Sequence, residues 1–345
     1  MSTPEPIIHT CFEPRTSTWQ YIVADPSTKS AVIIDSVLDF DPSTNTISTE
    51  TADGLLSLVE ENGYTVRHIL ETHVHADHLT ASRYLQQQLE QTNPDHTKPA
   101  ICIGKRIHGV QERFARRYGI DKAEYDGAFD RLIDDDDVFF LGELQVQAMH
   151  LPGHTPDHMG YMVGGTQPPS HQPDLCTADP PQPTSSAATP SSTPTSAPRG
   201  ATFPTATPTS CMPPSLRLRP QKYRLTPHPS YASVSKLFSL PAPTKIYTGH
   251  DYPPGGDARQ EPRAYTTVAE QKEANKHLKA GTSEAEFVAW RQGRDAGLAE
   301  PRLLHQALQF NIRAGRLPAP REGCVGGFGD RLLHVPVKVK GGRSW

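Results

Sequence analysis

The feature that most constrains this chain is a cluster of metal-ligand side chains directly after a short apolar run. The stretch "VRHILETHVHADHL" places His73, His75, Asp77 and His78 within six positions. Alternate residues at a strand end point the same way, so the first two histidines can face one cation. The turn that follows lets the aspartate and the third histidine face a second position beside it. The cluster therefore predicts a metal site at the carboxyl end of a strand.

The first 165 residues alternate between strand-like and helix-like segments. The β-rich runs "WQYIVA" and "SAVIIDS", separated by the turn-forming "DPSTKS", predict a hairpin. Residues 49–62 have helical spacing, with Thr49 as the candidate N-cap. Further strands are expected at "VRHILET", "AICIG" and "ELQVQAMHL", and further helices at "LTASRYLQQQLEQ" and "RIHGVQERFARRYGI". This order is typical of an α/β protein, a class that places ligands at the carboxyl ends of strands.

Two more histidines stand in comparable settings. His154 lies in a Gly/Pro turn, "HLPGHTPDHMGY", between two expected strands, and His250 follows the strand-like "KIYTG". A single histidine is usually a surface residue or a satisfied core residue. Four ligand-type residues in six positions, followed by two strand-end histidines, favour a metal site instead. Several other histidines lack such a context and keep the structural interpretation: His9, His108, His158, His171 and His228.

The character of the chain changes at Thr166. Between Thr166 and Ser230 lie 16 of the 34 prolines, interleaved with serine, threonine and alanine, so this tract is predicted to be a disordered linker or insertion. Regular structure is expected again from "YASVSKLFSLP" onward. Helical patterns follow in "TTVAEQKEANKHL" and in "SEAEFVAWRQGRDAGL", where Ser283 and Glu286 have the spacing of a capping box.

Charge and composition narrow the class of partner. The net charge is −4 and no basic stripe is present, which argues against nucleic acid and against an anionic membrane surface, and favours a small-molecule substrate. The five cysteines are widely spaced and form no CxxC pair, so neither a disulfide framework nor a zinc knuckle is indicated. No apolar run reaches membrane-spanning length. A soluble, cytoplasmic protein is expected; a mitochondrial location stays open, without a clear transit peptide.

Three motifs in order carry a family resemblance. T-H-x-H-A-D-H, then G-H-T-P, then G-H-D-Y resembles the metallo-β-lactamase superfamily, and within it the persulfide dioxygenase, glyoxalase II-like branch. Ala76 in "HVHADH" resembles the alanine that the dioxygenases carry at this position. Glyoxalase II typically carries a third adjacent histidine and a bulky residue in this motif. The resemblance implies a four-layer αββα fold. Residues 7–165 would form its first part, 166–230 a low-complexity insertion, and 231–345 the remainder with C-terminal helices.

The resemblance also implies roles for single residues. A glutathione-dependent persulfide dioxygenase, active in sulfide detoxification, would oxidise glutathione persulfide to sulfite and glutathione with O2. One Fe(II) per chain would be held by His73, His154 and an aspartate, a two-histidine, one-carboxylate site. The other four candidates, His75, Asp77, His78 and His250, would then support these ligands or remain from a second metal position. Tyr252 resembles a residue that touches the glutathione moiety, and a homodimer is compatible with the family.

Two alternatives remain open. In a glyoxalase II-like thioester hydrolase, a hydroxyacylglutathione hydrolase, all six candidates would bind two Zn or Fe ions, and a bridging hydroxide would attack a thioester. Both chemistries need the aspartate of a "GDTLF"-like strand after the G-H-T-P turn, and this sequence lacks the motif. Asp174 and Asp179 stand in a proline-broken stretch that would hold a carboxylate poorly. The chain could therefore also be an inactive isoform or a defective gene product.

The tract itself suggests why the motif is missing. The codons of Ala188–Arg199, read one base earlier, permit a string that begins Gly-Asp-Thr-Leu-Phe. Met212–Arg217, shifted in the same way, permits Tyr-Ala-Ser-Val-Ser-Lys, which the chain spells in frame at Tyr231–Lys236. We hypothesise that residues 166–230 are largely a frame-displaced product. A natural disordered insertion is the alternative.

Overall fold

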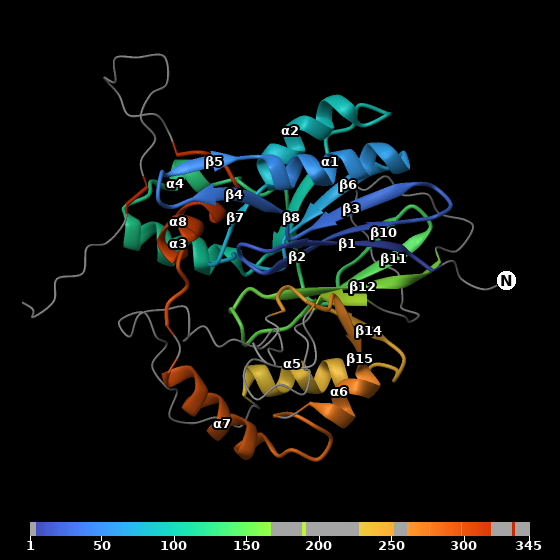
Figure 1. Cartoon of the computed structure of the whole chain (residues 1–345), viewed down its shortest axis with the longest axis vertical. Helices are drawn as coiled ribbons and strands as arrows, with labels where there is room; N and C mark the ends of the chain where they lie inside the picture. The colour runs from blue at the N-terminus through green and yellow to red at the C-terminus, as the bar shows by residue number, and fades with distance from the viewer. Residues whose placement is uncertain are drawn as a thin grey trace, which may run out of the picture.

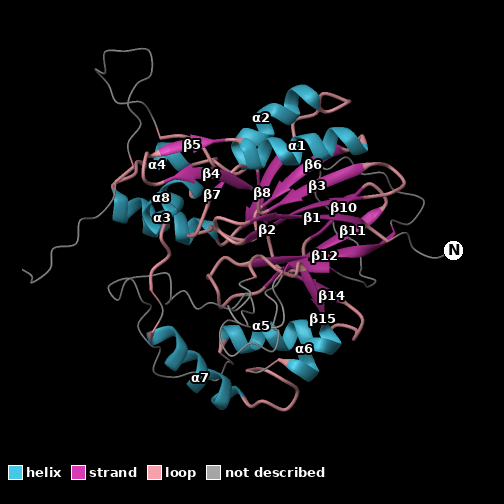
Figure 2. Cartoon of the chain, in the orientation of Figure 1, coloured by secondary structure: helices cyan, strands magenta, loops and turns pink. Residues whose placement is uncertain are grey.

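The computed structural model of the chain describes residues 5–166, 188–190, 228–251, 261–275, 277–297, 299–318 and 333–334. Two layers of sheet lie face to face, and helices cover both outer faces (Figure 1). Helices α1 (Glu50–Asn62) and α2 (Ser82–Thr92) cover one side, whereas α5 (Pro229–Phe238) and α7 (Glu284–Ala296) cover the other (Figure 2). The predicted four-layer α/β architecture is therefore confirmed.

The larger sheet has six strands in the order β1-β2-β3-β6-β8-β9. The strands are β1 (Ile7–Glu13), β2 (Thr18–Ala24), β3 (Ser30–Ile34), β6 (Thr65–Leu70), β8 (Ala100–Gly104) and β9 (Arg131–Ile133). The predicted hairpin of β2 and β3 is present, with Tyr21 opposite Ile34. From β3 to β9 neighbouring strands run parallel, so β3 and β6 end at the same edge of the sheet. The predicted metal cluster begins at that edge.

Three smaller sheets complete the strands. One contains β10 (Val138–Leu141), β11 (Leu144–His150) and β12 (Met159–Thr166), all antiparallel. A second contains β13 (Ala188–Pro190), β14 (Lys245–Tyr247) and β15 (Tyr265–Thr267). The third contains β5 (Thr46–Ser48), β4 (Val37–Asp41) and β7 (Leu79–Thr80). Strand β7 follows the histidine cluster directly, so the cluster is held by regular structure at both of its ends.

The remaining helices are α3 (Ile107–Tyr118), α4 (Lys122–Tyr125), α6 (Val268–Ala274) and α8 (Leu304–Asn311). The capping box predicted at Ser283 and Glu286 is present at the start of α7. Thr49 is the N-cap residue of α1, as predicted, but its side chain makes no capping bond: its backbone (φ −118°, ψ 6°) is not extended, and its hydroxyl donates to the Asp53 carboxylate instead. Within the described ranges, no helix is long and apolar enough to cross a bilayer.

Apolar side chains fill the spaces between the layers. Ile22, Ile33 and Ile69 face the helices and pack with Leu55 and Leu85 from α1 and α2. On the opposite face of the larger sheet, a second core joins it to β10, β11 and β12. A third core lies beneath α5 and α7. Both faces of the central sheet are therefore buried, which explains why its parallel strands read as continuous apolar runs.

The low-complexity tract contributes one element that its composition does not predict. Ala188–Pro190 forms β13, which pairs in parallel with β14 and places Thr189 opposite Ile246. The expectation of no regular structure is therefore wrong at these three residues. Strand pairing uses backbone N–H and C=O groups, so a short segment can complete a sheet edge whatever its composition. Most of the tract from 167 to 227 lies outside the described residues.

Buried His68 makes stability sensitive to acid. Burial first, and Arg131 and Arg67 nearby, lower the pKa of His68 to about 3, against an ordinary value of 6.5. The unfolded chain then binds more protons, so stability is lost as the pH falls from 6.5 toward 3. By pH 5 this loss is about 2 kcal/mol.

His68→Leu should therefore reduce the difference between the free energies of unfolding at pH 7.5 and pH 5.0 by about 2 kcal/mol. Urea titrations at both pH values measure it. His108→Leu, at an exposed position of α3, is the control. Equal acid sensitivity of the two variants would contradict the prediction.

Candidate metal centre

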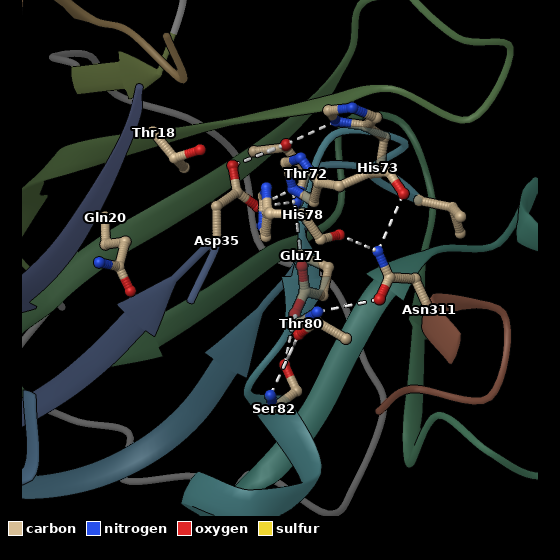
Figure 3. Close-up of polar contacts among 12 residues, drawn as sticks. Thr18, Gln20, Asp35, Glu71, Thr72, His73, His78, Thr80, Ser82 and Asn311 are labelled. Atoms are coloured by element: carbon tan, nitrogen blue, oxygen red, sulfur yellow. Dashed lines mark hydrogen bonds and ion pairs between the residues drawn. The ribbon is translucent and has the colours of Figure 1, made fainter. Parts of the chain in front are cut away.

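Three separate segments bring the predicted ligands together at one end of the sheets. The loop between β6 and β7 carries His73, His75, Asp77 and His78, and the turn between β11 and β12 carries His154. His250 stands three residues after β14 and forms a bridge with Thr18 of β2. Figure 3 shows the part of this loop around His73 and His78. The long-range convergence predicted from the sequence is therefore present in the fold.

His73 and His154 face each other at one side of the centre. Their Nε2 atoms are 2.9 Å apart, and His73 Nδ1 lies 2.9 Å from the Thr72 hydroxyl. Two nitrogens on one tetrahedral cation are separated by about 3.3 Å. Burial is the main cause that lowers the pKa of both histidines well below the ordinary value, so both rings are neutral near pH 7. The two Nε2 atoms therefore face each other at a distance close to, and slightly shorter than, that between two ligands of one cation.

His75 is oriented by a buried carboxylate. Its Nε2 lies 3.0 Å from Asp35 Oδ1, and Asp35 also accepts from the Thr72 backbone N–H at 2.7 Å. A ring that donates through Nε2 presents Nδ1 to a metal, and Nδ1 lies 4.0 Å from Asp77 Oδ1. Although burial lowers its pKa, the carboxylates of Asp35, Asp77 and Glu71 raise it to about 9. A cation that binds here must displace that proton.

Asp77 links the two remaining histidines. Its Oδ2 lies 2.9 Å from His78 Nδ1 and 3.3 Å from His250 Nε2. The other nitrogen of His250 is 3.1 Å from the Ser17 carbonyl, which can only accept, so Nδ1 carries the hydrogen. One ligand atom from each of His75, Asp77 and His250 lies within 4.8 Å of the others. This group is a second candidate cation position, next to the His73 and His154 pair.

Sequence reasoning missed the acidic residues that support the loop. Asp35 and Glu71 follow the apolar runs of β3 and β6 directly, which is the signal that could have identified them. Glu71 accepts from the hydroxyls of Thr80 and Ser82, and burial raises its pKa to about 7 (Figure 3). Asp157 accepts from the Val74 backbone N–H at 3.1 Å. All three carboxylates are at most 2% exposed.

His158 is oriented by a backbone carbonyl. Its Nδ1 lies 3.2 Å from the Leu151 carbonyl, which orients the ring. The ring centre is 5.1 Å from that of His73 and 5.7 Å from that of His154. His158 therefore packs against the His73 and His154 pair and does not belong to the group of His75, Asp77 and His250.

The His73 and His154 pair lacks a carboxylate partner among the described residues. No group of close histidine, cysteine and acidic side chains found there contains both histidines. Asp174 and Asp179, weak candidates from the sequence, lie outside the described residues, as does Tyr252. The donor set thus fits a metal ion in general, but a two-histidine, one-carboxylate site is incomplete at this pair.

A cleft opens beside the ligand pair. His73, His154, Asp77 and Asp157 contribute its polar lining. The apolar lining comes from Ala76, Val110, Phe114, Leu304 and Leu308. A small molecule can therefore bring a reactive atom to the metal position while it packs against an apolar wall.

Comparison with known proteins identifies the family. The model of the metallo-beta-lactamase superfamily matches residues 14–166. Glyoxylase B2 of Dictyostelium discoideum is 34% identical over 90% of this chain and 91% of its own length. The beta-lactamase hydrolase-like protein of Xylella fastidiosa is 35% identical over 97% of this chain, which spans 65% of the length of that relative. The chain belongs to the metallo-β-lactamase superfamily, as its motifs predict.

Relatives in the predicted branch are also found. Persulfide dioxygenase ETHE1 of Bos taurus is 29% identical over 46% of this chain and 48% of its own length. The crystal structure of ETHE1 from Myxococcus xanthus matches with a TM-score of 0.58 at 24% identity, and covers 90% of this chain and 100% of that one. At that identity the structural match supports the fold alone. The resemblance to the branch is confirmed by the sequence similarity to the persulfide dioxygenase of Bos taurus.

Asp35→Asn should weaken metal binding. The amide is a poorer acceptor for His75 Nε2–H, so the ring loses the partner that orients it, and affinity should fall by about 10- to 100-fold. Co²⁺ titration followed by absorption measures the dissociation constant. Asp95→Asn is a matched control, because Asp95 also accepts from a backbone N–H but lies in an exposed turn. The prediction fails if both variants bind Co²⁺ equally well.

Proposed function

We propose that this chain derives from a glutathione-dependent persulfide dioxygenase that uses one Fe(II). The observation that carries the proposal is the pair of Nε2 atoms of His73 and His154, 2.9 Å apart beside an apolar cleft. Ala76 within the histidine cluster and the similarity to persulfide dioxygenase ETHE1 of Bos taurus favour this branch. Glutathione persulfide and O2 would be the substrates.

The net reaction sets what the site must do. The outer persulfide sulfur gains two oxygen atoms from O2 and one from water and leaves as sulfite, and glutathione is released as the thiol. Bound Fe(II) would supply the centre at which O2 and the sulfur meet. The chain would contribute neutral imidazoles as ligands, and the wall formed by Val110, Phe114 and Leu308 would keep water from the sulfur.

A thioester hydrolase is the second candidate. The group of His75, Asp77 and His250 favours it, because this group offers a second cation position next to the first. Hydroxyacylglutathione hydrolase of Mesorhizobium japonicum is 25% identical over 69% of this chain. In such an enzyme two Zn or Fe ions would generate a hydroxide for attack on a thioester carbonyl.

Metal content and substrate separate these two candidates. We expect anaerobic reconstitution to give at most one iron per chain, with O2 uptake that depends on glutathione persulfide and yields sulfite. Two metals per chain and cleavage of a glutathione thioester without O2 uptake would support the hydrolase. Inactivity toward both substrates would support a third interpretation, an inactive isoform or defective gene product.

The missing carboxylate bears directly on that third interpretation. We propose that the tract is largely frame-displaced and that position 189 marks the place of the absent aspartate. Two observations support this: the shifted reading begins Gly-Asp at positions 188 and 189, and Ala188–Pro190 pairs with the strand that leads to His250. The shifted reading requires the codon of Ala188 to be GCG, so the transcript sequence tests the idea directly.

Thr189→Asp should increase the amount of iron that each chain retains after reconstitution and desalting. A carboxylate at the middle residue of β13 would supply the acidic ligand that the His73 and His154 pair lacks among the described residues. Thr189→Asn is the control, because it has the same size and no charge. Iron bound per chain, measured by atomic absorption, should rise in the aspartate variant alone. Equal iron in the two variants would count against this place for the carboxylate.

A further inference from the structure

Asn311, the last residue of α8, contacts the loop that carries four of the six candidate ligands. Its Nδ2 donates to the carbonyls of His75 at 2.9 Å and His78 at 2.8 Å. Its Oδ1 accepts from the Thr80 backbone N–H at 2.9 Å. Figure 3 shows the amide between Thr80 and the histidine loop. One buried side chain thus holds three backbone groups between His75 and Thr80, across the end of the histidine loop and β7.

The chemistry of these partners allows only one orientation of the amide. Carbonyl oxygens accept and a backbone N–H donates, so Nδ2 must face His75 and His78 while Oδ1 faces Thr80. Asn311 is 3% exposed. Its removal would leave two carbonyls and one N–H without these bonds in a buried region, which is unfavourable because such groups need partners. The contact is therefore specific to an amide at this position.

The same helix also lines the cleft. Leu304 and Leu308 belong to the apolar lining, and with Asn311 they follow the i, i+4, i+7 spacing of one helix face. Past the end of α8, Gly315 (φ +77°) approaches so closely that an added Cβ would lie 3.0 Å from the Thr80 carbonyl oxygen. This face of α8 is therefore packed against both the loop and the substrate space.

We propose that Asn311 is a positioning residue that holds the His75–Thr80 loop in the conformation in which its ligands converge. Asn311 binds no metal and touches no substrate. It acts through the backbone on which His75, Asp77 and His78 are mounted. The effect of Asn311 on catalysis rests on the proposed function. Its restraint on the loop does not, because these hydrogen bonds form without metal.

The test compares two exchanges of amide for acid. Asn311→Asp keeps the shape and the acceptor for Thr80 but loses both donors to the loop. The matched control is Gln111→Glu: Gln111 is also buried, and its Nε2 donates to the carbonyls of Ile312 at 2.9 Å and Tyr125 at 3.3 Å. The control therefore loosens the end of α8 without a contact to the histidine loop.

Hydrogen exchange of the metal-free protein and Co²⁺ titration are the two measurements. In Asn311→Asp we expect backbone exchange over residues 74–80 to accelerate at least tenfold and the Co²⁺ dissociation constant to rise at least tenfold. Gln111→Glu should change neither quantity. Equal effects of the two variants, or no effect of Asn311→Asp, would overturn the proposal.

Asn311→Ser and Gln111→Ser provide the same comparison if the aspartate variant does not fold. If the proposed function is wrong, a different set of measurements changes. Persulfide-dependent O2 uptake would then be absent in the unsubstituted protein, while the difference in loop exchange between the two variants would remain.

Discussion

The histidine loop between β6 and β7 is polar and yet buried, and the whole centre depends on how its backbone groups are satisfied. His73, His75 and His78 are at most 4% exposed. Buried N–H and C=O groups need partners, and a loop without regular structure must find them elsewhere in the chain. Asp35, Asp157 and Asn311 supply them from three distant segments. The arrangement of this loop is thus a property of the whole domain, although its four candidate ligands lie within six positions of the sequence.

The sequence identifies the candidate ligands more readily than the residues that support them. A histidine cluster behind an apolar strand is recognisable because ligand chemistry needs those residue types at that spacing. Asp35 and Asn311 carry no comparable signal, since an acid after a strand or an asparagine at a helix end is common, and only packing shows what each contacts. Thr49 illustrates the same limit: its position relative to α1 is predicted correctly, but its backbone angles and the competing Asp53 carboxylate prevent the cap. Local patterns give positions, whereas partners depend on the tertiary structure.

In the low-complexity tract, strand pairing depends on backbone groups, whereas metal binding would depend on side chains. Strand β13 pairs with β14 through backbone groups, so Ala188–Pro190 can join the sheet whatever its sequence. Composition predicts no strand there because alanine and proline favour other conformations. A segment can therefore keep its place in the fold without supplying a metal ligand. The His73 and His154 pair has no acidic partner in the part of the chain that the structure describes.

Thr18 and His250 are 232 positions apart, and Asn311 is 236 positions from His75. During synthesis at about 5–20 residues per second, the loop with its four ligand-type residues would emerge roughly 10–50 s before the helix that restrains it. For that interval the nascent chain presents three histidines and an aspartate on an unrestrained segment, open to any divalent ion. Which metal ion the loop binds would therefore depend on when, during synthesis, the ion meets it. We expect the loop to hold one conformation for a metal ion only after α8 has left the ribosome, because α8 carries Asn311.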